Sequence, residues 1–263
     1  MEKYVVVDQA LMCATPEEEL EMLHRTGLLE AIYPEVAAMV GFGGGSSGHK
    51  DLWWHTKLVV AQTVAVRAVR WAALFHDVGK VPTFSRASGK VTFHGHEVVS
   101  ARLFDVAARR TGLERPLRKR VRHLVRHLGQ VESYASDWTD SAVRRLHRQL
   151  AEAWDDAIQL ACADITTKHA HKRRQHRARM TELAERARAI EAQDAALPLL
   201  PKGLGRVVID TLGLEPGPMV GETMKRLERA VEAGEVPPRA PADVYVDYLK
   251  RRAASDGPPP DSP

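Results

Sequence analysis

The segment WAALFHDVGK, residues 71–80, constrains the fold more than any other part of the chain. Its first five residues, from Trp71 to Phe75, are apolar on every side, so we expect them to be buried. His76 and Asp77 end this apolar run. A buried carboxylate beside an imidazole is costly unless a partner compensates its charge. We therefore searched for other His and Asp residues at the edges of apolar helix faces.

Most of the chain carries apolar residues at helical spacing, and no segment shows a convincing run of alternating strand residues. The stretches 41–51 and 82–95 are rich in Gly, Ser or Pro, which is typical of loops. We predict an all-α fold, a helical bundle with a smaller C-terminal helical extension. The Pro-rich segment 253–263 is predicted to be disordered.

Composition narrows the class of protein. The 263 residues are 44% hydrophobic and 27% charged, as in ordinary soluble globular proteins. No stretch approaches the roughly 18 consecutive apolar residues of a membrane span, and the first residues do not resemble a secretory signal. Two cysteines, Cys13 and Cys162, cannot build a disulfide framework. We expect a cytoplasmic protein that does not bind membranes.

Positive charge is unevenly distributed. The formal net charge is only +4, but Arg and Lys are dense in RPLRKRVRHLVR at 115–126 and in KHAHKRRQHRAR at 168–179. Such runs are typical of solvated helix faces and equally of surfaces that contact phosphate groups or nucleic acid.

Four further residues flank apolar helix faces: His55, His96, His127 and Asp164. A single His of this kind is most often a hydrogen-bonded core residue. Asp164 alone would most simply pair with Lys168, one turn later. Together with His76 and Asp77, however, the set supplies imidazoles and carboxylates from five predicted helices. That combination is what a divalent cation needs in a helical bundle.

The pattern H...HD...H...H...D, with HDVGK at its centre, resembles the HD superfamily of metal-dependent phosphohydrolases. The resemblance is closer to the HD-containing half of bacterial tRNA nucleotidyltransferases, the CCA-adding enzymes. It rests on GLLEAIYPEV, DLWWHT, LFHDVGK, FHGHE, LVRH and GLEPGPMVGETMKRLERAVEAGEV. These segments lie within residues 15–237.

The resemblance implies a ligand set. Four residues would hold the first metal ion: His55, His76, Asp77 and Asp164. Where two ions bind, Asp77 would bridge them, and His96 and His127 would hold the second. His123 is an alternative to His127. Mixed His and carboxylate ligands favour Ni, Mn, Co, Fe or Zn over Mg.

The resemblance also implies catalytic roles. Asp77 and Lys80 would act in catalysis. We also expect the substrate to contact Lys80, His123 and Arg126, because the basic helix that carries Arg126 starts near the proposed site. Transferase activity in the CCA-adding family comes from an upstream β-containing head with a glycine pair and a DxD-type carboxylate motif. Residues 1–14 do not supply it, and no carboxylate pair follows the glycines at 43–45. We therefore do not expect nucleotide addition.

The leading hypothesis is a phosphohydrolase that acts on nucleotides or RNA ends, mainly as a 2',3'-cyclic phosphodiesterase, with 2'-nucleotidase or phosphatase activity beside it. Two alternatives remain open: a non-catalytic tRNA- or RNA-binding module, and an HD enzyme that hydrolyses (deoxy)nucleoside triphosphates. The absence of a GYP motif disfavours a cyclic dinucleotide substrate. The predicted domains are an N-terminal helical segment with a Gly-rich loop (1–48), the HD metal-binding domain (49–195) and a C-terminal helical region (196–252).

Overall fold

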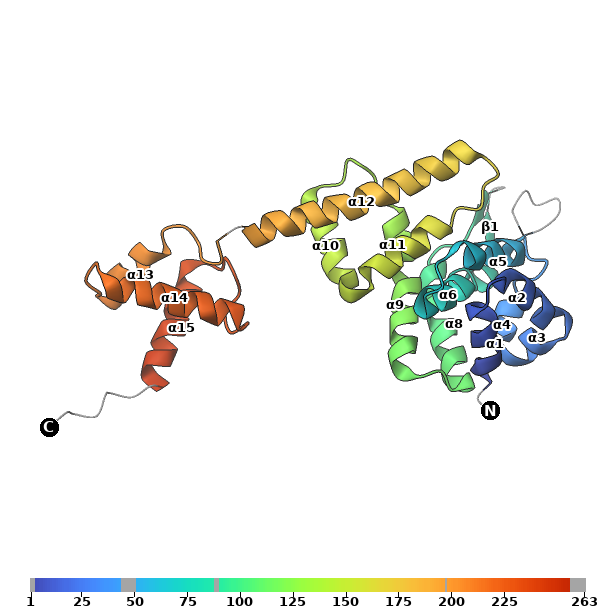
Figure 1. Ribbon diagram of the computed structural model, residues 1–263, viewed down its shortest axis with the longest axis horizontal. Coiled ribbons are helices and arrows are strands. Elements are labelled where there is room, and N and C mark those ends of the chain that lie inside the picture. Colours follow the sequence, from blue (N-terminus) through green and yellow to red (C-terminus); the bar gives the residue numbers. More distant parts are fainter. Residues whose placement is uncertain (1–2, 44–50, 88–89, 197, 256–263) are drawn as a thin grey trace. The chain divides into compact units, whose positions relative to one another are not determined.

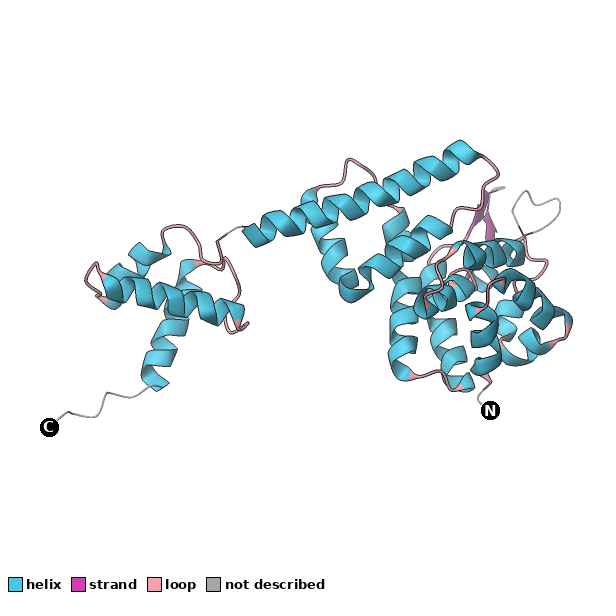
Figure 2. Ribbon diagram, viewed as in Figure 1, coloured by secondary structure: helices cyan, strands magenta, loops and turns pink. Residues whose placement is uncertain are grey.

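The computed structural model describes residues 3–43, 51–87, 90–196 and 198–255. These residues are helical apart from turns, loops and one antiparallel hairpin, β1 (Ser85–Ala87) with β2 (Lys90–Thr92) (Figure 2). The all-α prediction is confirmed, although the hairpin lies in a stretch predicted as loop. Two compact units make up the chain, Met1–Ile190 and Glu191–Pro263. The division predicted from sequence at residues 48 and 195 stays a prediction.

Part of the predicted Gly-rich loop, 44–50, and part of the predicted tail, 256–263, lie outside the described residues. The helices of the first unit are labelled in Figure 1 or follow from its colours. They are α1 (Tyr4–Met12), α2 (Pro16–Arg25), α3 (Leu28–Ile32), α4 (Pro34–Ala37), α5 (Leu52–Gln62), α6 (Arg67–Phe75), α7 (Lys80–Thr83), α8 (His96–Thr111), α9 (Arg115–Glu132), α10 (Asp140–Leu150), the 3-10 helix η1 (Ala151–Ala153), α11 (Trp154–Ala163) and α12 (Ala170–Ala196), which continues past Ile190.

Helix α6 lies in the core of the first unit. Every residue from Ala68 to Phe75 is buried, because α6 packs against α1, α5, α9 and α11. Even Arg70 is buried, and its guanidinium donates to the carbonyl oxygen of Cys13 at 2.9 Å. The apolar run seen in the sequence therefore delivers His76 and Asp77 to the interior of the bundle, where they are 2% and 1% exposed.

Gly79 brings the end of this segment against helix α8. A Cβ at residue 79 would lie 2.3 Å from the carbonyl oxygen of His96 and 2.6 Å from the backbone nitrogen of Ser100. The Gly79 N–H also donates to the Ser100 hydroxyl at 2.8 Å. Only glycine fits this approach of two backbones, and it holds the HD pair close to His96.

The second unit contains α13 (Leu204–Leu212), α14 (Pro218–Glu232) and α15 (Ala242–Ser255). Its own apolar core is formed by residues that include Leu204, Val208, Leu227, Tyr245 and Leu249. The Tyr245 hydroxyl donates to the carbonyl oxygen of Pro237 at 2.8 Å. In neither unit is any described helix both long and apolar enough to cross a bilayer.

Candidate metal centre

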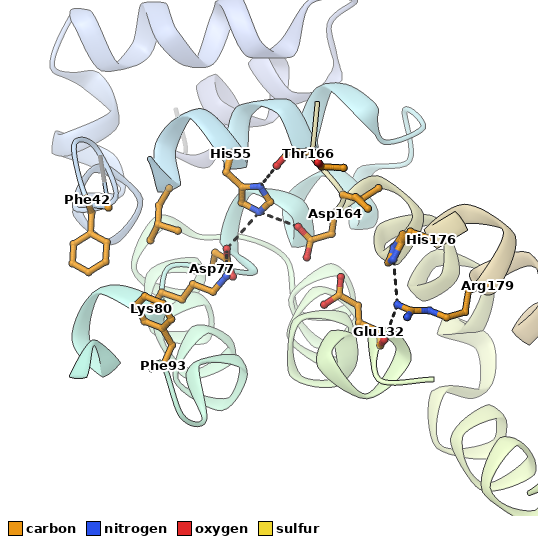
Figure 3. A pocket seen from close by; sticks show the side chains of 14 residues that line it. Phe42, His55, Asp77, Lys80, Phe93, Glu132, Asp164, Thr166, His176 and Arg179 are labelled. Carbon is orange, nitrogen blue, oxygen red and sulfur yellow. Dashed lines mark hydrogen bonds and ion pairs between the residues drawn. The ribbon is translucent and has the colours of Figure 1, made fainter. Parts of the chain in front are cut away.

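Four side chains converge where α6 ends. His55 comes from α5, His76 and Asp77 directly follow α6, and Asp164 directly follows α11. Nε2 of His55 lies 3.2 Å from Nε2 of His76 and 2.9 Å from Oδ1 of Asp164. Nε2 of His76 lies 3.3 Å from that Asp164 oxygen and 3.3 Å from Oδ2 of Asp77. Figure 3 shows His55, Asp77 and Asp164 pointing toward one another.

The hydrogen bonds of the two Nδ1 atoms orient the imidazoles of His55 and His76. Nδ1 of His76 lies 2.8 Å from the carbonyl oxygen of Ala73, which can only accept, so this nitrogen carries the proton. Nδ1 of His55 lies 2.8 Å from the hydroxyl oxygen of Thr166, which can donate or accept, and it accepts from Nδ1 in the tautomer that leaves the Nε2 lone pair free. A neutral imidazole that donates through Nδ1 presents an Nε2 lone pair, which is the form that binds a metal ion. Both Nε2 atoms face the cluster.

The electrostatics of the cluster favour positive charge. Burial lowers the pKa of His76, but Asp77 and Asp164 outweigh burial and raise it well above its usual value. Burial raises the pKa of both carboxyls, but the neighbouring His76 outweighs burial and keeps the pKa of each below its usual range. A proton on His76 and a metal ion would satisfy the same carboxylates, so the two compete.

The donor set fits a divalent cation. His55, His76 and Asp164 each offer one ligand atom, and these atoms all lie within 4.8 Å of one another. Oδ1 of Asp164 is buried and, among the residues that the structure describes, has no hydrogen-bond partner of acceptable geometry, despite the two imidazoles beside it. A buried carboxylate oxygen normally has a partner, and a cation between these atoms would provide one. Imidazole with carboxylate is a donor set suited to first-row transition metals and zinc.

Asp77 connects this group to two further residues. Its Oδ1 lies 3.6 Å from Nε2 of His96, whose Nδ1 donates to the carbonyl oxygen of Phe93 at 3.1 Å. Its Oδ2 accepts from Nζ of Lys80 at 2.6 Å. Burial lowers the pKa of Lys80, but Asp77 outweighs burial and raises it, so the ammonium stays charged. The structure thus brings His96 and Lys80 to the cluster.

His127, in contrast, is not brought to the cluster. The α9 residues that border it are Val125, Leu128, Gly129 and Glu132. Because an α-helix turns about 100° per residue, His127 lies on nearly the opposite side of α9. There its Nδ1 donates to the carbonyl oxygen of His123 at 2.8 Å. The fold therefore does not bring His127 beside His96, as the predicted second metal site required. The spacing in the sequence did not determine how α9 is rotated about its own axis.

His123 and Arg126 line a different pocket, of about 1120 Å³, between α8, α9 and η1. Nε2 of His123 donates to the carbonyl oxygen of Gln149 at 3.0 Å. Burial, together with His127, lowers the pKa of His123. The sequence predicted that Lys80, His123 and Arg126 all contact the substrate. In the structure His123 and Arg126 line a different pocket from Lys80.

The cluster opens into a pocket of about 530 Å³ (Figure 3). Three ionisable residues on its wall were not predicted as site residues: Glu132, His176 and Arg179. Burial, together with the neighbouring Asp164 carboxylate, raises the pKa of Glu132 to about 9. Glu132 follows Leu128 by four positions on one face of α9, and this periodicity was the available signal.

The comparisons with known proteins agree with this geometry. A family model for the HD domain matches residues 53–197, more than half of the chain. The chain belongs to the HD domain family. The matched region of the HD domain contains the converging residues His55, His76, Asp77, His96 and Asp164. HD domains bind divalent metal ions, and the His-His-Asp group is where this one offers ligands.

Similar proteins include tRNA nucleotidyltransferases. The chain is 32% identical over 234 residues to an A-adding tRNA nucleotidyltransferase of Deinococcus radiodurans, covering 85% of this chain and 52% of the relative. It is 30% identical over 250 residues to a CC-adding tRNA nucleotidyltransferase of Thermus thermophilus, covering 91% of this chain and 55% of the relative. This HD protein therefore spans about half the length of the curated relatives it matches, and the resemblance to the HD-containing half is confirmed.

Proposed function

We propose that this HD protein is a metal-dependent phosphohydrolase that acts on nucleotides or RNA ends, with 2',3'-cyclic phosphates as its main substrates. The observation that carries the proposal is the convergence of two Nε2 atoms and two carboxylates beside a pocket whose wall holds His55, Asp77, Asp164 and Lys80. Membership of the HD family supports it.

The residues of the pocket would divide the work. His55, His76, Asp77 and Asp164 would hold the cation, with Thr166 and the Ala73 carbonyl keeping the imidazoles oriented. When bound, a divalent cation activates water for attack on phosphorus and withdraws charge from the phosphoryl oxygens. Lys80, charged and held by Asp77, would bind one of those oxygens. Nickel, manganese, cobalt, iron and zinc fit the ligands better than magnesium.

The test is turnover after metal exchange. Protein stripped with chelator and reloaded singly with nickel, manganese, cobalt, zinc or magnesium is assayed with 2',3'-cAMP, 2'-AMP and dATP. We expect metal-dependent release of a nucleoside monophosphate from 2',3'-cAMP, abolished by Asp77→Ala and unchanged by Asp155→Ala, an exposed acid on α11. Hydrolysis of dATP alone would favour the triphosphate alternative, and no turnover with any metal would contradict the proposal.

A second candidate function, RNA binding, is supported by the pocket between α8, α9 and η1. Four cationic side chains there form no ion pair within the described part of the chain: Arg102, Lys119, Arg122 and Arg126. In contrast, Arg120 beside them pairs with Asp156 at 2.7 Å. Unpaired cations gathered in one groove attract the phosphate backbone of nucleic acid. We propose that this basic groove binds RNA, either as substrate or, in the non-catalytic alternative, as the sole ligand.

A further inference from the structure

Arg179 on α12 enters the metal-centre pocket without belonging to the HD pattern. It lines the same pocket as Lys80, Asp77 and Asp164. In Figure 3 Lys80 and Arg179 reach in from different elements, with the carboxylates of Asp77, Asp164 and Glu132 between them in that view. The chain therefore offers two cationic side chains around one acidic cluster.

Two acceptors fix the position of the Arg179 guanidinium. Nη2 donates to the carbonyl oxygen of Glu132 at 3.2 Å and to Nδ1 of His176 at 3.3 Å. His176 is itself held, because its Nε2 donates to the carbonyl oxygen of Ala161 at 2.7 Å. With the proton on Nε2, Nδ1 of His176 is an acceptor, which is what Arg179 requires. The guanidinium is thus aimed before any substrate arrives.

The charge of Arg179 is not neutralised by the protein. No carboxylate lies within ion-pair distance of it among the residues the structure describes, and its Nε is buried without a hydrogen-bond partner. The guanidinium is partly buried at the wall of the pocket, where an anionic ligand would balance its charge. Nε of Arg70 is also buried without a partner in the described part of the chain, but Arg70 lies in the core and lines none of the pockets described above. Arg179 differs because it faces a pocket large enough for a ligand.

We propose that Arg179, positioned by His176, binds a phosphate oxygen of the substrate in this pocket. Nη2 already donates to two acceptors and Nε is buried, so Nη1, which has no partner among the described residues, is the donor left to meet a phosphate oxygen. This inference deepens the proposed phosphohydrolase function and depends on it for the identity of the substrate. The phosphate contact itself is measurable without turnover.

The experiment compares orthophosphate binding to metal-loaded full-length wild type, Arg179→Gln, Arg179→Lys and His176→Gln by titration calorimetry. The matched control is Arg174→Gln, an exposed arginine on the same helix. We expect at least about a tenfold weaker phosphate affinity for Arg179→Gln, partial recovery with Lys, a smaller loss for His176→Gln and no change in the control. Metal content and melting temperature are measured alongside to confirm folded, loaded protein.

A phosphate affinity of folded, loaded Arg179→Gln within twofold of wild type would overturn the inference. A rise in KM for 2',3'-cAMP with little change in kcat would support a contact made already in the bound substrate. If wild type binds phosphate through Arg179 but hydrolyses nothing, the phosphohydrolase proposal fails while the phosphate site stands.

Discussion

The two sides of helix α9, which has eighteen residues, border different chemistry. One side, through Leu128, Gly129 and Glu132, borders the buried carboxylates and imidazoles of the metal centre. The other, through Lys119, Arg122 and Arg126, lines the basic groove. Residue types in the sequence therefore identify candidate ligands and cationic contacts. The rotation of the helix about its axis decides which of them lie together in one site.

The largest expected effect is on enzymatic activity, which should depend on the metal-centre side of α9 and not on the side that lines the basic groove. Asp77→Asn removes a charged oxygen that faces both His76 and Lys80. We expect turnover of 2',3'-cAMP to fall at least about 100-fold, because losing even an outer-sphere partner of a metal centre costs about 10–100-fold. Arg122→Gln, on the other side of α9, should leave turnover of this mononucleotide unchanged. Steady-state kinetics measures both variants. Equal losses of activity would show that the two sides of α9 do not have separate roles.

The sequence predicted only some of the residues at the metal centre and its pocket. The buried run 71–75 and the HD pair specified α6, and His55 and Asp164 were found as polar residues at the edges of apolar stripes. Glu132 was missed because its face of α9 becomes distinctive only once α6 and α11 pack against it. Arg179 was missed because one arginine in the run 168–179 looks like its neighbours.

The two histidine assignments on α9 show the same limit. His123 and His127 were candidates because both lie one turn apart on a helix with a clear apolar stripe. Their rings lie close together and tilted, with centroids 4.3 Å apart, but on the side away from the cluster. The sequence around these two histidines does not indicate which face of α9 borders the metal centre.

The next effect tests how the metal centre is supported. Thr166→Val removes the partner of Nδ1 of His55 while keeping the volume of the side chain. We expect metal affinity to fall about 10–100-fold, with turnover recovering at high metal concentration. The control, Thr181→Val on the exposed face of α12, should bind metal like wild type. Competition with a fluorescent chelator measures both, and equal affinities would show that Thr166 does not orient His55.

The basic side should show its effect in RNA binding. Replacing Arg122 and Arg126 together with Gln removes two cations that form no ion pair among the described residues. We expect tRNA affinity to fall about tenfold and the salt dependence, log K against log [salt], to lose about 0.7–0.9 in slope per lost phosphate contact. Filter binding between 50 and 200 mM salt tests this. An unchanged slope would remove the basic groove from the account.

A smaller effect concerns stability against pH in metal-free protein. Glu132 has a pKa of about 9 in the folded protein and an ordinary value of 4.5. Between these values the folded state holds a proton that the unfolded state has lost, so stability falls as pH rises. His76, with a raised pKa, adds to the fall only above its ordinary value of 6.5. Glu132→Gln should therefore flatten the decline of melting temperature between pH 5 and 6.5, and a decline as steep as in wild type would contradict the assignment.

The smallest expected effect is at His127. His127→Asn keeps a donor near the carbonyl oxygen of His123 and should change metal affinity less than twofold. Glu132→Gln, on the side of α9 that borders the cluster, removes an acidic group next to Asp164 and should weaken metal binding more. Metal titration of both variants sharpens the comparison. A larger loss for His127→Asn would mean that the two sides of α9 have been assigned wrongly.

The most direct test of the central claim is anomalous diffraction from crystals of the full-length protein soaked with Zn²⁺ and measured on both sides of the zinc absorption edge. We predict an anomalous peak within about 2.0–2.2 Å of Nε2 of His55 and of His76, with Asp164 and Asp77 oxygens completing the coordination. A peak on the other side of α9, beside His123 and His127, or no peak near His55 and His76, would contradict the assignment of the metal centre.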